Sequence, residues 1–180
     1  MTSGGRDEGP RFGILGDLEV TVDRRRLALG GPKQRGLLAM LLIHVNQPVS
    51  AGRLTEALWG SSPPAGAEVT LRTHVSHLRR HLASIGADGV LITRPSGYSL
   101  VVDPEQVDAY RFERLAGLGQ EAVGLADPER AAGLLREALD LWRGSVLQDL
   151  DRPLFAEAET VRLEGLRLDA VEARISADLA

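Results

Sequence analysis

The chain has 180 residues, of which 43% are hydrophobic and 26% are charged, and this composition is typical of a globular protein rather than a disordered one. It contains no cysteine, which excludes disulfides, thiolate metal sites and a cysteine nucleophile. The net charge of −4 hides a division, because residues 1–103 carry 12 Lys+Arg and 9 Asp+Glu (+3), whereas residues 104–180 carry 9 and 16 (−7). A basic half followed by an acidic half predicts two modules with different partners.

The N-terminal segment, residues 1–10, is rich in glycine and charge and is expected to be a disordered tail. It has no apolar core of a signal peptide, and no apolar run in the chain is long enough to span a bilayer. We therefore expect a cytoplasmic protein with no membrane partner.

Short apolar pieces near 11–15, 18–22 and 26–29, separated by Gly, Asp and Arg, predict a small antiparallel meander. The next segment, "GPKQRGLLAMLLIHVNQ", has the apolar spacing of a helix with a wide buried stripe, and Pro32 fits its first turn.

A second helix is predicted in "VSAGRLTEALWG", with Ser50 as its N-cap and Gly60 as its stop. "SSPPAGA" must be a loop, since two consecutive prolines cannot continue a helix.

The third helix is predicted over 67–84 and contains "TLRTHVSHLRRHL". At 100° per residue its aliphatic side chains share one face, which we expect to be buried: Leu71, Val75, Leu78 and Leu82. The opposite face is expected to hold Thr73, Ser76, His77 and Arg80, flanked by Arg72 and Arg79.

After this helix, "VLITRPSGYSLVV" consists of two β-rich runs around a turn and predicts a hairpin. Beyond a boundary at 103–108 the pattern is helical, with helices expected near 108–124, 128–143 and 154–179. The order predicts an α+β protein, in which a winged helix-turn-helix over 11–103 is followed by an all-α segment over 104–180.

The outward face of the third helix fits a DNA major groove, because it offers cations for phosphates and hydrogen-bonding groups for base edges. An ordinary solvated face is the alternative. No Asp or Glu occurs from 69 to 87, whereas solvated faces usually mix both signs of charge, and this favours DNA. Arg94 at the hairpin turn is expected to enter a minor groove or touch phosphate. Lys33 and Arg35, at the start of the first helix, are further candidates for phosphate contacts.

Other chemistry is weakly supported by the sequence. His74, His77 and His81 share one edge of the third helix, but no carboxylate accompanies them and Arg79 and Arg80 would repel a metal ion. No catalytic constellation or phosphate-binding loop is present, so no enzyme, metal or cofactor is predicted. Asp149, in a predicted loop, is expected to be solvated.

Several motifs together resemble the Streptomyces antibiotic regulatory protein (SARP) family: "LGGPKQRGLLAMLLIHVNQPVSAGRLTEALWG", "TLRTHVSHLRRHL", "RPSGYSL", "VDAYRFERLA", "EALDLWRGSVLQDL" and "AEAETVRLEGLRLDAVEARISADL". The resemblance implies an OmpR-like winged helix joined to a bacterial transcriptional activation domain of tetratricopeptide type. It further implies an activator that binds direct repeats of double-stranded DNA near promoters of biosynthetic genes, two copies together, and recruits RNA polymerase.

By position, the family's DNA-contacting residues correspond to Arg72, Thr73, Ser76, His77 and Arg80, with Arg94 in the wing. We also expect Arg79 to share phosphate or base contacts. The loop "WGSSPPAGA" falls where OmpR-like proteins present a surface to polymerase.

The family's second domain normally continues with further helices, so we expect either a truncated or a short natural form. With few repeats, Leu163, Leu166, Val171 and Ile175 are expected to be partly exposed or to pair with a second chain. Because residues 1–10 alone come before the first predicted strand, we expect no receiver domain before the winged helix and no phosphorylation in cis. Two alternatives to an activator remain, a helical-repeat adaptor and a regulator that responds to a small molecule.

Overall fold

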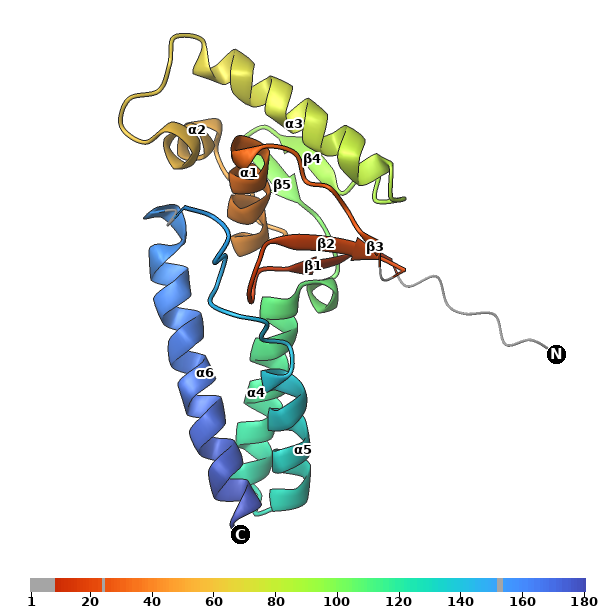
Figure 1. Cartoon of the computed structure of the whole chain (residues 1–180), viewed down its shortest axis with the longest axis vertical. Helices are drawn as coiled ribbons and strands as arrows, with labels where there is room; N and C mark the ends of the chain where they lie inside the picture. The colour runs from red at the N-terminus through yellow and green to blue at the C-terminus, as the bar shows by residue number, and fades with distance from the viewer. Residues whose placement is uncertain (1–8, 24, 152–153) are drawn as a thin grey trace, which may run out of the picture.

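The computed structural model of the chain describes residues 9–23, 25–151 and 154–180. Most of the tail predicted for residues 1–10 lies outside the described residues. The molecule is elongated, with a mixed helix and strand region at one end and long helices at the other (Figure 1).

The N-terminal half begins with an antiparallel three-stranded sheet, and it ends with a two-stranded hairpin. Its strands are β1 (Arg11–Gly13), β2 (Glu19–Val22), β3 (Arg25–Arg26), β4 (Leu91–Arg94) and β5 (Gly97–Leu100). The predicted meander and hairpin are confirmed, although the meander strands are shorter than expected.

Along the chain, three helices follow the sheet and precede the hairpin: α1 (Pro32–Ile43), α2 (Ala51–Trp59) and α3 (Ala67–Ala83). Ser50 caps α2 as predicted, since its side chain accepts a hydrogen bond from the Arg53 N–H. Gly60, with φ of 68°, ends the same helix. The three helices pack on one another, and Figure 1 shows α3 lying along the outer edge of the molecule. This arrangement is a winged helix-turn-helix.

The C-terminal half is a bundle of three helices: α4 (Asp108–Gly124), α5 (Pro128–Leu139) and α6 (Glu157–Asp178), with single turns η1 (Pro104–Gln106) and η2 (Leu154–Ala156). Helix α5 is four residues shorter than the predicted 128–143. Among the described residues, no helix has the length and apolar character needed to cross a bilayer.

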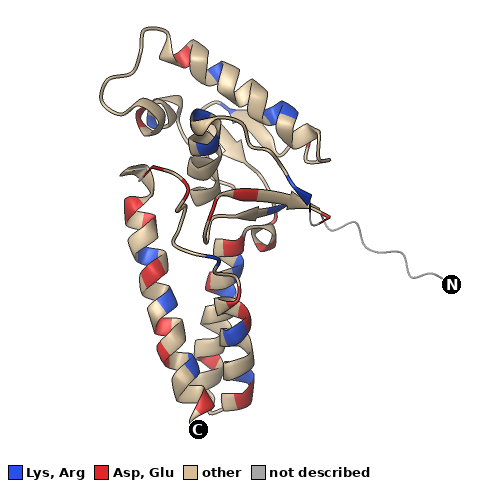
Figure 2. Ribbon diagram, in the orientation of Figure 1, with Lys and Arg blue, Asp and Glu red and all other residues tan. Residues whose placement is uncertain are grey.

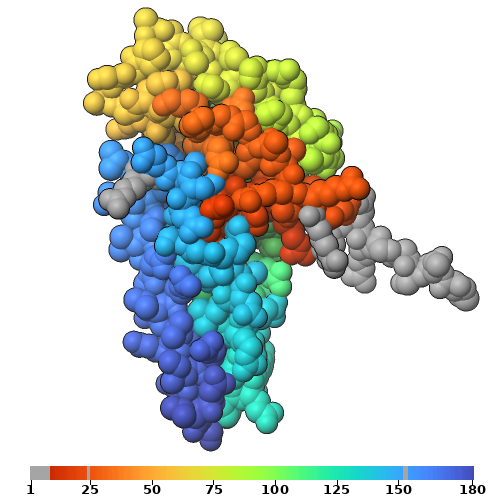
Figure 3. Space-filling model, viewed as in Figure 1, coloured from red at the N-terminus to blue at the C-terminus, as the bar shows by residue number. Residues whose placement is uncertain are grey.

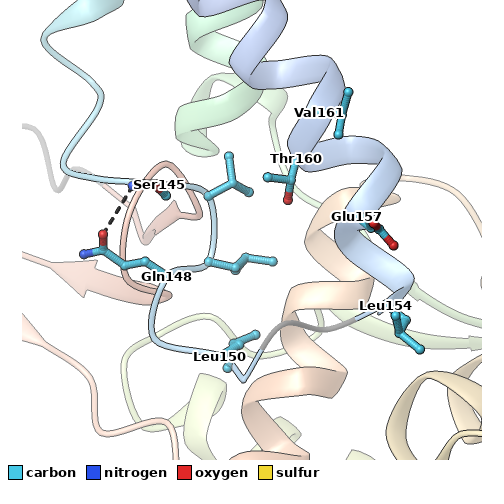
Figure 4. A pocket seen from close by; sticks show the side chains of 9 residues that line it. Ser145, Gln148, Leu150, Leu154, Glu157, Thr160 and Val161 are labelled. Carbon is cyan, nitrogen blue, oxygen red and sulfur yellow. Dashed lines mark hydrogen bonds between the residues drawn. The ribbon is translucent and has the colours of Figure 1, made fainter.

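Helix α6 packs against the neighbouring helices of the bundle through a buried side that includes Leu163. This corrects part of the prediction, because Leu163 was expected to be partly exposed; Ile175 is exposed as expected. A hollow of about 570 Å³ lies between the first turns of α6 and the loop that carries Ser145, Gln148 and Leu150 (Figure 4).

The two halves are in continuous contact (Figure 3). The loop that connects β1 to β2 supplies backbone donors and acceptors, and the segment after α5 folds back onto it. The Arg143 N–H donates to the Leu15 carbonyl at 2.8 Å, and the Leu147 N–H donates to Ile14 at 3.0 Å. A parallel bridge also joins Phe12 in β1 to Val107.

Candidate nucleic-acid interface

Helix α3 is anchored by the predicted aliphatic stripe. Leu71, Val75, Leu78 and Leu82 are all fully buried. Burial of each such side chain contributes about 1.5–3 kcal/mol, which fixes the rotation of the helix about its axis. The side of α3 opposite to this stripe therefore faces outward.

The outward face of α3 carries Thr73, Ser76 and Arg80, all exposed. Within the described residues, the Arg80 guanidinium forms no hydrogen bond or ion pair. Val69, 65% exposed, lies on the same face. Sequence reasoning missed it, because only the polar residues were considered, but an apolar side chain is suited to the methyl group of thymine.

Arg72 lies at the edge of this face. Its guanidinium approaches the carboxylate of Glu68, one turn earlier, at 4.0 Å. Both side chains are well exposed, and such a pair contributes little in water. Arg72 thus remains available to an external anion. Figure 2 shows the basic bands along α3 and the single acidic band near its start.

Arg79 is engaged with the hairpin. Its Nε donates to the Leu91 carbonyl at 2.9 Å, and its Nη2 donates to Thr93 Oγ1 at 2.8 Å. Both acceptors belong to β4. Arg79 therefore ties the C-terminal half of α3 to the hairpin, an arrangement that the sequence alone did not predict.

Arg94 occupies the tip of that hairpin. It pairs with Gly97 across a two-residue connection. The side chain is exposed and has no hydrogen-bonding or ionic partner in the part of the chain that the structure describes. The hairpin turn is confirmed, and it presents a free cation beside α3.

The histidine edge of α3 packs against α1 and α2, which differs from the expectation. His77 was predicted to face outward, but it is half-buried, with Nδ1 at 3.1 Å from Gln34 Nε2 in α1. The ring of His74 lies 6.1 Å from that of Trp59. The neighbours from α1 and α2 cover this edge, and a helical projection cannot show them.

Burial lowers the pKa of His74 below its ordinary value of 6.5, and the positive charges of His77 and Lys33 add to the effect. His74 therefore favours its neutral form in the folded protein. No group of His, Cys, Asp and Glu side chains in the described residues could hold a metal ion.

The two cations at the start of α1, Lys33 and Arg35, also contact other residues of the protein. Lys33 Nζ donates to the Leu58 carbonyl at the end of α2 and lies 5.6 Å from the centroid of Trp59. Arg35 pairs with Asp149. The expectation that Asp149 is solvated was wrong: its carboxylate also accepts the Leu18 N–H at 2.8 Å. Both cations thus contribute to packing between elements.

Two protein families match this chain. Residues 25–100 match the family described as "Transcriptional regulatory protein, C terminal", and residues 107–180 match "Bacterial transcriptional activator domain". The first range ends at the last residue of the hairpin, and the second begins one residue before α4.

Curated relatives include the regulatory protein AfsR of Streptomyces coelicolor, 40% identical over 94% of this chain and 17% of AfsR. The regulatory protein DnrI of Streptomyces peucetius is 38% identical over 82% of this chain and 57% of DnrI. A solved structure of Mycobacterium tuberculosis EmbR in complex with a low-affinity phosphopeptide is 37% identical, with a TM-score of 0.91 over 94% of this chain and 45% of that chain. The chain thus spans from about a sixth to somewhat over half of the length of these relatives.

A winged helix followed by this helical bundle defines a class of bacterial transcriptional regulators, not of enzymes. Within that class, the chain belongs to the Streptomyces antibiotic regulatory protein family, with an OmpR-like winged helix followed by a bacterial transcriptional activation domain.

Proposed function

We propose that this chain is a sequence-specific DNA-binding transcriptional activator, with a DNA-binding domain over 11–103 and an activation domain over 104–180. The observation that carries the proposal is the outward face of α3, which bears hydrogen-bonding side chains and the Arg80 guanidinium, for which the described residues offer no carboxylate partner. Arg72, at the edge of this face, has Glu68 as an acidic neighbour, and that pair is exposed. Such a face complements the phosphates and base edges of a major groove.

In the proposed complex, α3 lies in the major groove with Thr73, Ser76 and Arg80 directed at base edges, while Arg72 contacts phosphate or a base edge. Arg94 at the hairpin tip reaches phosphate or the adjacent minor groove. Arg79 and His77, engaged with the hairpin and with α1, position these groups. Lys33 and Arg35 add to the local positive potential rather than making primary contacts.

The family resemblance supports the remaining parts of the proposal. Two copies bind direct repeats near promoters of biosynthetic genes, arranged head to tail. The activation domain and the loop over 60–66 contact RNA polymerase. The site of action is then the cytoplasm, on the nucleoid.

The test uses Arg80→Ala. DNA sites are first selected by the unchanged chain from fragmented genomic DNA, and affinities for a selected and a scrambled duplex are measured by fluorescence anisotropy. We expect Arg80→Ala to lose about 1–3 kcal/mol of discrimination between the two duplexes, because a guanidinium that contacts a base edge distinguishes bases.

Arg130→Ala is the matched control, since Arg130 is an exposed arginine in α5, far along the chain from α3. It should leave the discrimination unchanged. If the unchanged chain selects no sites, or if Arg80→Ala discriminates as well as Arg130→Ala, the proposed contact surface is incorrect.

A further inference from the structure

Four exposed side chains form a line along the outward face of α3. Val69, Thr73, Ser76 and Arg80 are spaced four, three and four residues apart, which places them within about 60° of one another around the helix axis. We call these four residues the outward line. Its two ends differ in chemistry, because it begins with an aliphatic side chain and ends with a guanidinium.

Val69, at the N-terminal end of the outward line, is 65% exposed. A single exposed aliphatic residue is common on protein surfaces and does not by itself indicate a contact. A β-branched side chain at a solvated helix position nevertheless has a cost, because the helix restricts its χ1 rotation and no burial compensates for that loss. A partner that covers Val69 would supply the burial, and the neighbouring side chains indicate what that partner is.

The next residue of the outward line, Thr73, uses its hydroxyl group within the helix. Its Oγ1 donates to the Val69 carbonyl at 3.1 Å. A threonine hydroxyl has one hydrogen, so Thr73 keeps its methyl group and the lone pairs of its oxygen for another molecule, but no donor. The N-terminal half of the outward line is therefore mainly apolar and has no free hydrogen-bond donor.

The C-terminal half of the outward line has the opposite character. Neither the Ser76 hydroxyl nor the Arg80 guanidinium forms a hydrogen bond or ion pair with the residues that the structure describes. A guanidinium carries five N–H donors in a fixed fork, and those of Arg80 are free for another molecule. A partner of the whole line must therefore offer an apolar group at one end and acceptors at the other.

The base edges of a DNA major groove offer both kinds of group. Thymine alone presents a methyl group there, guanine presents two acceptors, and adenine and cytosine each present an amino donor. An amino group that faced Val69 would lose water and gain no hydrogen bond, whereas the thymine methyl group would gain apolar contact. The two acceptors of guanine match the fork of Arg80.

We propose that Val69, supported by Thr73, selects thymine through its 5-methyl group, and that Arg80 selects guanine at the other end of the same site. This inference rests on the proposed DNA binding and adds what the DNA site contains. Val69 and Arg80 are about 16 Å apart along the helix at 1.5 Å per residue, so the two bases lie within about five base pairs of each other at 3.4 Å per base pair.

The test replaces each thymidine of a selected duplex, one at a time, with deoxyuridine, which pairs identically but lacks the methyl group. Affinities of the unchanged chain and of Val69→Ala are measured by fluorescence anisotropy. We expect one deoxyuridine position to weaken binding of the unchanged chain about threefold to fourfold, through loss of one buried methyl group. Val69→Ala should bind the thymidine duplex more weakly and show no further loss at that position, which identifies the contact by non-additivity.

Val123→Ala is the matched control, since Val123 is an exposed aliphatic residue on α4, and it should keep the full deoxyuridine effect. Alanine favours helix more than valine does, so Val69→Ala should fold as the unchanged chain does, which circular dichroism checks. Arg80→Ala should also keep the effect while losing discrimination at another base pair.

Three results would refute the assignment of Val69 while the Arg80 test of DNA binding still succeeds. The first is a set of selected sites without a shared thymine within about five base pairs of the position that Arg80 discriminates. The second is a deoxyuridine effect that Val69→Ala retains at every position. The third is equal DNA affinity of Val69→Ala and the unchanged chain, which would assign Val69 to a protein partner. A chain that selects no DNA would refute both this inference and the proposed function.

Discussion

Individual arginines of α3 and of the hairpin have separate roles in the proposed DNA complex. Arg79 uses its Nε and Nη2 donors within the protein, whereas Arg94 has no partner among the described residues. Two arginines fifteen positions apart in the sequence thus have different surroundings, and their variants should be distinguishable in solution.

We predict that Arg94→Ala weakens DNA binding and reduces the slope of log affinity against log salt by about one unit, because it removes one phosphate contact. Arg79→Ala should also weaken binding, through loss of the bonds to β4, but with the slope unchanged. Affinities measured over a salt series test this. Equal loss of slope in both variants would mean that Arg79 itself contacts phosphate.

His74 gives a pH dependence whose sign is fixed by its surroundings. Its folded-state pKa is lowered by burial beside Trp59, so its contribution to stability is present above pH 6.5 and is lost as the pH falls through the folded value. We predict that His74→Gln loses less free energy of unfolding than the unchanged chain between pH 7 and 5. Urea unfolding at each pH measures this, and equal losses in the two proteins would contradict it.

At the level of the elements, the position of the hairpin depends on a close backbone approach. Gly97 has φ of 142° and lies against the Val49 carbonyl, with which Tyr98 makes a bridge. A Cβ at position 97 would overlap the oxygen of Val49. The strand can therefore reach the start of α2 only with glycine at this position.

We predict that Gly97→Ala lowers the free energy of unfolding by at least about 1–3 kcal/mol, because strain and overlap combine. Gly133→Ala in α5, where the added methyl group meets open space, should instead be neutral or stabilise by up to about 1 kcal/mol. Chemical denaturation compares the two. A Gly97→Ala protein as stable as the unchanged chain would show that the hairpin can shift away from Val49.

At the level of the whole molecule, Asp108 is one of the carboxylates that join the two halves. Asp108, at the start of α4, accepts the Ile14 N–H at 2.8 Å, the Leu15 N–H at 3.0 Å and Arg143 Nη2 at 2.8 Å. Its side chain is only 12% exposed. Burial raises the pKa of Asp108, and these three donors oppose the rise. Direct bonds of this kind predict that the halves unfold together.

We predict that Asp108→Ala destabilises the chain by about 1–3 kcal/mol for each buried donor left without an acceptor, and that it separates the unfolding of the two halves. Differential scanning calorimetry should show one transition for the unchanged chain and two for the variant. Asp140→Ala, which removes an exposed carboxylate at the end of α5, should change stability by no more than about 0.5 kcal/mol. A single unshifted transition for Asp108→Ala would refute a joining role.

Sequence patterns between residues close together in the chain were sufficient to predict most of the fold. Apolar periodicity located six helices, and caps such as Ser50 and Gly60 marked their ends, because these signals depend on residues close together in the chain. The buried stripe of α3 followed from the same periodicity. The order of these elements in the chain then predicted a winged helix followed by an all-α part.

Whether each cation is free to contact DNA was decided by the tertiary structure alone. Arg35 pairs with Asp149 and Arg79 with β4, while His77 is covered by Gln34, although all three were candidate DNA contacts in the sequence. A helical projection gives the direction of a side chain relative to its own helix, but not what a distant segment places beside it. Sequence thus determined which groups are present and on which face they lie, and long-range packing decided which remain free to meet another molecule.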